Sequence, residues 1–172
     1  MSIRTLLLVL LIPLAGLLGI LVALSVGLYW HQQQTMQQNR ELARLMVDRI
    51  IMRQHWVELE TNEKFKNEVV AKLAGPVEAW RGIRPAELRR GDAAFEPQDL
   101  FEKDLLARFA PQPATTNQAS MFAERFAQNE YQYYQPIFAE KLCVDCHRIH
   151  SGNPRLSAGD LLSIIQVRLP QK

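Results

Sequence analysis

Two cysteines and one histidine carry the most specific chemistry in the sequence. Cys143 and Cys146 are the only cysteines, and His147 directly follows the second one. Two thiols at this spacing can each form a thioether bond to one of the two vinyl groups of a haem, and the adjacent imidazole then ligates the iron. We therefore expect one covalently attached haem c, held by Cys143, Cys146 and His147.

Three other uses of a C-x-x-C pair compete with haem. A thioredoxin-type redox site belongs to a βαβ unit, which the sequence around Cys143 does not indicate. A zinc site needs a second Cys/His pair, and His150 alone does not supply one. A disulfide across so short a loop would stabilise the fold little. The lack of other cysteines and the histidine that follows favour haem.

A second iron ligand would be a histidine or a methionine. His55 is the first choice, because it stands beside Trp56 on a segment with the pattern of a helix that covers a sheet. Met52 is the alternative, and an iron without a second protein ligand is the third possibility. His150 stands too close to His147 to reach the opposite haem face. For any single methionine here, namely Met46, Met52 or Met121, core packing is the better explanation.

Acid–base catalysis has little support in the sequence. Glu102 and Asp104 lie on a short amphipathic segment, and we expect them to form a solvated helix face. No other constellation of catalytic side chains accompanies them. We therefore expect that the protein is not an enzyme.

The longest apolar run precedes all of these residues. Residues 5–30 contain no charge and exceed the ~20 residues that a helix needs to cross a bilayer. A cleaved signal peptide is the alternative, but its apolar core is usually only ~7–15 residues long. We expect residues 1–30 to be a single-pass anchor in the cytoplasmic membrane, in contact with lipid over 5–30. Arg4 favours the cytoplasmic side, which places the remaining chain in the periplasm or outside the cell.

The rest of the chain predicts an α+β fold. Residues 31–74 lack proline and glycine and repeat apolar residues at helical spacing, which predicts a long helix or stalk that ends at Gly75 and Pro76. Residues 75–172 would form the haem domain. Before residue 98 we expect mostly loop, with room for a short strand. After it we expect a helix at 99–109, a helical turn or two at 118–126, and antiparallel strands at 131–138 and 161–169. The haem motif lies between these last two strands.

Residues 82–170 resemble a family of small haem c, PAS-like extracytoplasmic domains. The domain stands alone in some bacteria, including photosystem-associated cyanobacterial proteins, and forms the sensor part of some membrane histidine kinases. The resemblance rests on AAFEPQDLFEKDLLARF, YYQPIFAEKLCVDCH and AGDLLSIIQVRLP. It implies a PAS-like antiparallel sheet packed on the long N-terminal helix. The matching positions are Tyr134, Pro136, Cys143, Cys146, His147, Gly159, Asp160 and Pro170.

This chain departs from the family pattern at two points. Arg148 follows the proximal histidine, where many members carry a small residue. Some members use a cysteine of the N-terminal helix region as distal ligand, and this chain has no third cysteine. The distal ligand therefore stays open among His55, Met52 and none.

The composition and the motif together favour electron transfer. The chain has 20 Lys and Arg against 18 Asp and Glu, and this near-neutral balance gives no reason to expect nucleic-acid binding. We expect a monohaem carrier of single electrons that meets a redox partner protein or membrane complex. The alternative is a haem-based redox or gas sensor that signals through the long helix to a partner. The same helix could pair with a second copy in a homodimer.

Overall fold

The chain folds into two compact units, Met1–Glu41 and Leu42–Lys172, and helix α1 (Ile3–Leu59) contributes to both. The computed structural model describes residues 3–59, 79–89, 91–109, 121–141, 143–145, 148 and 155–170. The expected continuation of the long helix over 60–74, and its end at Gly75 and Pro76, lie outside these residues.

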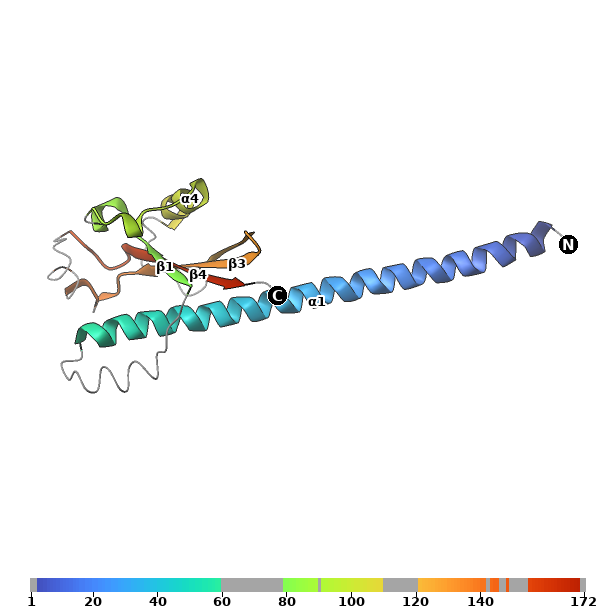
Figure 1. The fold of residues 1–172 in the computed structure, drawn as a ribbon, viewed down its shortest axis with the longest axis horizontal. Coiled ribbons are helices and arrows are strands. Elements are labelled where there is room, and N and C mark those ends of the chain that lie inside the picture. Colours follow the sequence, from blue (N-terminus) through green and yellow to red (C-terminus); the bar gives the residue numbers. More distant parts are fainter. Residues whose placement is uncertain are drawn as a thin grey trace. The chain divides into compact units, whose positions relative to one another are not determined.

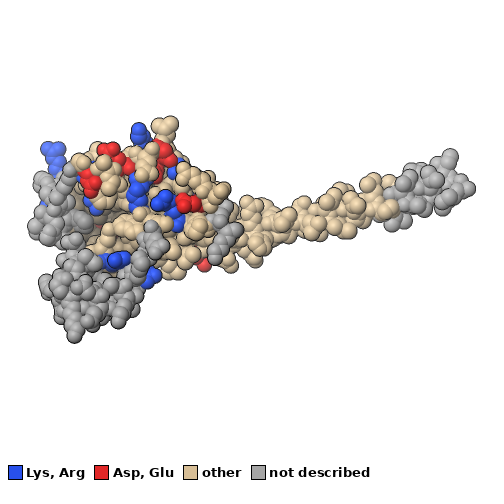
Figure 2. All heavy atoms as spheres, in the orientation of Figure 1, with Lys and Arg blue, Asp and Glu red and all other residues tan. Residues whose placement is uncertain are grey.

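The first unit is an apolar helix. Within Pro13–His55, an 18-residue window has a mean hydropathy of 1.9, and none of it is buried. Figure 2 shows the stretch of this helix beside the N-terminal end in tan, without charged side chains, and the sequence has no Lys, Arg, Asp or Glu between Arg4 and Arg40. The helix is thus long and apolar enough to cross a membrane, as expected for residues 5–30. The retention of this segment and the side of the membrane on which the chain emerges stay predictions.

The second unit contains a four-stranded antiparallel sheet in the order β1-β4-β3-β2. Its strands are β1 (Trp80–Ile83), β2 (Ala123–Ala127), β3 (Glu130–Phe138) and β4 (Leu161–Pro170). The long central pair β3–β4 confirms the strands predicted at 131–138 and 161–169 and their antiparallel pairing (Figure 1). Residues 139–160 therefore connect two neighbouring strands at one end of the sheet.

The prediction of helical turns at 118–126 is wrong for its described part. Ala123–Ala127 is strand β2, which pairs with Glu130–Tyr134 of β3. Gln128 and Asn129 connect the strands with φ angles of 55° and 60°. A two-residue loop with both φ angles positive matches the right-handed twist of a hairpin. This turn and the pairing with β3 override the helical preference of the alanine, glutamate and arginine in β2.

Both faces of the sheet are covered. Ala43, Val47 and Ile50 recur at helical spacing on α1 and pack against one face. Helix α4 (Leu100–Phe109) covers the opposite face with Leu105 and Phe109 (Figure 1). The strand side chains that face α1 are Tyr131, Tyr133, Ile165, Val167 and Leu169. This arrangement confirms the predicted α+β fold with an antiparallel sheet packed on the long helix, and α4 confirms the helix predicted at 99–109.

The segment between β1 and α4 is mostly loop, as predicted, with 3₁₀ turns at Ala86–Leu88 and Ala93–Phe95. The Asp92 side chain caps the second turn by accepting a hydrogen bond from the Ala94 N–H. Arg84 N donates to Phe95 O at 3.0 Å, which closes the loop back onto β1.

The prediction that Glu102 lies on a solvated face of α4 is wrong. Its side chain is only 1 % exposed, whereas Asp104 is exposed as predicted. Arg81 Nη2 donates to both Glu102 carboxylate oxygens at 2.5 Å, and Gln98 N donates to Oε2 at 2.6 Å. A buried carboxylate is tolerated because these charged and backbone donors replace water.

Candidate functional site

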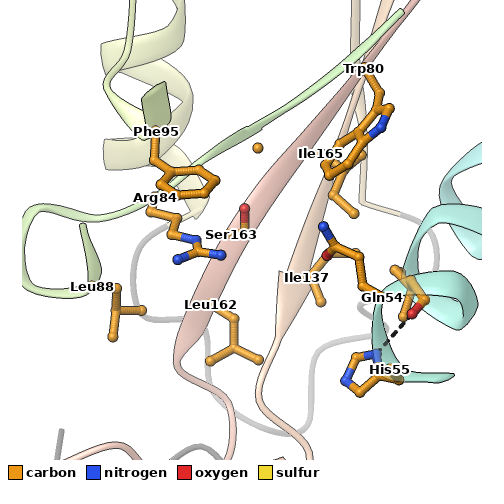
Figure 3. Close-up of a pocket in the computed structure, with 12 residues that line it drawn as sticks. Gln54, His55, Trp80, Arg84, Leu88, Phe95, Ile137, Leu162, Ser163 and Ile165 are labelled. Atoms are coloured by element: carbon orange, nitrogen blue, oxygen red, sulfur yellow. Dashed lines mark hydrogen bonds between the residues drawn. The ribbon is translucent and has the colours of Figure 1, made fainter. Parts of the chain in front are cut away.

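A cavity of about 150 Å³ opens between α1 and the end of the sheet from which the 139–160 connection leaves. Most of its described lining is apolar, with one imidazole and one guanidinium among the side chains (Figure 3). Helix α1, strands β1, β3 and β4 and the loop after β1 each contribute to the wall. The lining residues are Ile51, Gln54, His55, Trp80, Gly82, Arg84, Leu88, Phe95, Ile137, Leu162, Ser163 and Ile165.

His55 stands in the helical wall of this cavity. Its Nδ1 lies 2.9 Å from Ile51 O, one helical turn earlier (Figure 3). Because a carbonyl oxygen only accepts, this contact requires a proton on Nδ1, and the ring lone pair is then on Nε2. Histidines that bind metals generally use the other ring N–H in this way, which fixes the tautomer and the ring orientation. The structure thus places His55 in the cavity wall, and its role as an iron ligand stays a prediction.

Met52 does not share this position. Its side chain is 59 % exposed and is not part of the cavity lining. Successive helix residues are about 100° apart, so Met52 lies about 140° around the helix axis from Val47, which is the middle residue of the buried set on α1. The Met52 side chain therefore points away from the sheet. Met46 packs at the edge of the α1–sheet core, and Met121 packs against the core on the opposite face of the sheet. Of the histidine and methionine side chains considered from the sequence, His55 is the one that lines the cavity within the described residues.

The first residues of the C-x-x-C-H motif lie against the same region. Cys143 N and Val144 N both donate to Glu140 O, at 2.9 and 3.1 Å, which starts a helical turn. Val144 is buried in a small cluster whose neighbour Leu162 also lines the cavity. Cys143 itself is half-buried. The other predicted site residues, Cys146 and His147, and the candidate His150 lie outside the described residues.

Hydrogen bonds clamp the two ends of the connection that carries the motif. Ala139 N donates to Asp160 O, and Gly159 N donates to Ala139 O, both at 2.8 Å. Gly159 has a φ of +94°, a conformation that L side chains rarely adopt. The Asp160 carboxylate accepts from Ser157 N at 2.7 Å. The Gly-Asp pair noted in the resemblance thus fixes where the connection re-enters the sheet.

Arg148, one of the two departures from the family pattern, has a structural role. Its Nε donates to Leu156 O at 2.8 Å. This bond ties the residue after the motif to the segment that leads back into β4. Because Leu156 belongs to the same buried cluster as Val144, the contact supports the position of the motif.

The opposite face of the sheet carries a polar network around Tyr134. The Tyr134 hydroxyl donates to Gln132 Oε1 and accepts from Gln166 Nε2, both at 2.8 Å. Burial raises the pKa of Tyr134 to about 12, although the nearby Arg125 charge acts in the opposite direction. The Tyr134 hydroxyl is therefore protonated and structural at neutral pH.

Arg125 and Asp99 form an ion pair at the edge of this network, with Arg125 Nη2 2.8 Å from Asp99 Oδ2. Burial by itself would raise the pKa of Asp99, but the hydrogen bond from Glu102 N and the pair with Arg125 outweigh it, so the pKa is lowered. Burial would likewise lower the pKa of Arg125, and the hydrogen bond to Asp99 reverses this and raises it. The pair joins the start of α4 to β2.

The described residues fit a haem in their chemistry. The cavity offers apolar walls for a porphyrin and an imidazole for iron, and the turn that contains Cys143 packs on its Leu162 wall. A haem is larger than this cavity, so the described lining would cover only part of it. The apolar surroundings would also limit access of water to the iron.

The cavity wall that does not come from α1 was not predicted from the sequence. Arg84, Leu88 and Phe95 come from a loop without periodicity, so no pattern marked them. Trp80 and Gly82 are two residues apart on β1, so they face the same side of the sheet. The short strand expected before residue 98 was the only sequence feature that indicated this part of the wall. The contact between Arg84 and Phe95 depends on the folding of the loop, which the sequence does not reveal.

The fold and the site define a class of protein, namely a small α+β domain that follows an apolar N-terminal helix and carries C-x-x-C-H between its last two strands. Residues 32–170 match the family described as Tll0287-like (Tll0287), and the chain belongs to this family. The match begins directly after the apolar segment and extends through β4. No curated protein and no solved structure matches the chain.

Proposed function

We propose that the chain is a monohaem c-type cytochrome that carries single electrons on the extracytoplasmic side of a membrane. The observation that supports this most directly is the packing of the turn at Cys143 and Val144, the start of the C-x-x-C-H motif, against Leu162 of the cavity that His55 lines. Membership in the Tll0287-like family agrees with a haem c domain. Cys143 and Cys146 would form the thioether bonds, and His147 would ligate the iron.

The chain's own residues would provide the surroundings that electron transfer needs. When bound, haem c supplies one-electron chemistry at its iron. His147 and His55 would ligate the iron through imidazole nitrogens, and the hydrogen bond from His55 Nδ1 to Ile51 O would fix the orientation of the His55 ring. Two imidazoles leave no open coordination position. This favours a carrier over an oxygen-activating enzyme, since substrate could not reach the iron directly.

The apolar N-terminal helix supports a tethered location. It would hold the haem domain next to a redox partner protein or complex in the same membrane. Arg4 before the apolar run, and the absence of Lys and Arg from residues 31–39 directly after it, favour an amino terminus on the cytoplasmic side. The haem domain would then lie in the periplasm or outside the cell.

A sensor is the second candidate, and one observation favours it. His55 lies on α1, the same continuous helix that contains the apolar segment. A ligand that displaced His55 from iron would act directly on this helix. A sensor would need an iron that loses His55 readily, whereas a carrier would keep it in both oxidation states.

Absorption spectra of the purified full chain test the proposal and separate the two candidates. A carrier gives six-coordinate, low-spin spectra in the oxidised and reduced forms, and the reduced form does not bind carbon monoxide. His55→Ala should change the spectrum to high-spin and permit carbon monoxide binding. Met52→Leu is the matched control one turn away and should leave the spectrum unchanged. If H55A resembles the wild type, His55 is not the ligand, and binding of carbon monoxide by the wild type would favour the sensor.

A further inference from the structure

Helix α1 exposes an apolar face on the side that points away from the sheet. Leu42, Leu45 and Met52 are between 47 % and 66 % exposed. At about 100° per residue they lie about 140–160° around the helix axis from Val47, which is buried against the sheet (Figure 1). Apolar side chains that gather on one exposed face indicate an interaction surface.

These side chains have the spacing of a coiled-coil seam. Steps of three and four residues lead from Leu42 to Leu45, then to Arg49 and to Met52. This alternation is that of the a and d positions in a heptad. Arg49 is also exposed, and its long aliphatic stem can lie in a seam while the guanidinium extends to the edge. We refer to Leu42, Leu45, Arg49 and Met52 as the exposed stripe.

The sequence repeats the same spacing on both sides of the exposed stripe. Leucine occupies every a and d position within residues 14–28, and apolar residues occupy the next two positions after Met52. These residues are Leu14, Leu17, Leu21, Leu24, Leu28, Trp56 and Leu59. The positions between them are polar, at His31, Thr35 and Gln38. A sustained seven-residue repeat predicts a left-handed supercoil, and most membrane helices also pair with this hand.

A second copy of the chain is the occupant that fits the exposed stripe best. Lipid does not explain the stripe, because residues 31–41 separate it from the apolar run and contain a single apolar residue, Met36. Two copies anchored through the same segment would have the same orientation, so their helices would run parallel. Confinement to one bilayer would also raise their effective concentration.

The charges beside the exposed stripe are complementary between two parallel copies. Asp48 stands at a g position and Arg53 at an e position, and both side chains are exposed. In a parallel two-stranded coiled coil, the g residue of one helix faces the next e residue of the other helix. Asp48 of each copy would therefore meet Arg53 of the other copy, and the two-fold symmetry would repeat this contact.

We propose that the chain forms a parallel homodimer through the exposed stripe, with the two copies of α1 in register. The cavity is left intact in each copy, because its lining residues on α1 are Ile51, Gln54 and His55, none of which belongs to the stripe. The dimer therefore does not depend on what the cavity binds.

Disulfide cross-linking of the full chain in native membranes tests the dimer. Leu45→Cys places the thiols of two copies across the seam, so mild oxidation should give a product of twice the chain mass on a non-reducing gel. Arg44→Cys is the matched control, because Arg44 is the exposed neighbour at a c position outside the seam. The cross-linked fraction should be several-fold higher for L45C than for R44C. The wild type, with Cys143 and Cys146, gives the background.

Light scattering of the full chain in detergent tests the register. The wild type should have the protein mass of a dimer. Asp48→Arg brings a like charge to Arg53 of the other copy and should shift the mass towards that of a monomer. Asp48→Arg combined with Arg53→Asp restores opposite charges in the same register and should recover the dimer, which a general loss of folding would not do.

Three results would overturn the proposal. L45C and R44C could cross-link equally, which would indicate random collision and no seam. The L45C product could have the mass of a complex with a different protein, which would exclude a second copy as the occupant. The double charge reversal could remain monomeric, which would exclude the parallel, in-register pair. If L45C does not fold, Leu42→Cys decides in the same assay.

Discussion

The Glu102 carboxylate on α4 pairs with Arg81 on β1 and so joins these two elements. Glu102→Gln hardly changes the shape of the side chain, but it removes the charge and should destabilise the domain. The carboxylate is 1 % exposed and pairs with Arg81, whose side chain is 17 % exposed. Loss of one partner of a buried ion pair costs ~3–5 kcal/mol because the other charge stays buried. Water reaches part of Arg81, and the amide oxygen of glutamine still accepts a hydrogen bond, so we expect about 2–3 kcal/mol.

Urea unfolding of the full chain in detergent, followed by circular dichroism, measures this loss. With a slope of ~2 kcal/mol per molar urea, the midpoint should fall by roughly 1–1.5 M while the slope stays unchanged. Glu96→Gln is the control, since Glu96 is 57 % exposed and its carboxylate lies 3.3 Å from Arg89 Nη1. An exposed pair of this kind contributes ~0–1 kcal/mol. Equal midpoints for E102Q and E96Q would refute the reasoning.

Three further predictions concern Tyr134, Gly159 and the apolar helix. The folded pKa of Tyr134, about 12, lies above its ordinary 10.0, so its contribution to stability is complete below pH 10 and is lost as the pH rises to 12. The loss should reach about 2–3 kcal/mol, and in unfolding titrations Y134F should lack this part of the pH dependence. Gly159→Val should cost ~1–3 kcal/mol and lower the midpoint of thermal unfolding, because φ is +94° there, whereas the exposed neighbour variant Ala158→Val should change it little. An alkaline wash of membranes should leave the full chain in the pellet, and a soluble product lacking residues 5–30 would instead identify a cleaved signal peptide.

Hydrophobic patterns predicted the main elements because those elements depend on local sequence. The alternating aromatic residues of β3 and the β-branched run of β4 indicate strands wherever they pack. The apolar spacing before residue 59 likewise indicates a helix that covers a sheet. Strand β2 was missed because its sequence favours a helix, and only the Gln128–Asn129 turn and the pairing with β3 make it a strand.

The candidate site was only partly predictable for a related reason. His55 was proposed as the distal ligand from residue type and helical position, and the structure shows that His55 lines the cavity whereas Met52 does not. Its role as a ligand stays a prediction. Glu102 was misjudged because its partner Arg81 lies 21 residues earlier on β1, so the pattern of α4 alone contains no sign of the pair. Arg84 and Phe95 line the cavity from a loop. The conformation of a loop cannot be predicted from the spacing of apolar residues.

The covalent haem is the central claim, and the most direct test is a pyridine haemochrome spectrum of the full chain after denaturation and extraction of free haem. Thioether bonds survive this treatment, so we predict that one haem remains with each wild-type chain. Cys143→Ala combined with Cys146→Ala should abolish the retained haem. Complete extraction of haem from the wild type, or a purified chain that contains zinc and no iron, would contradict the account.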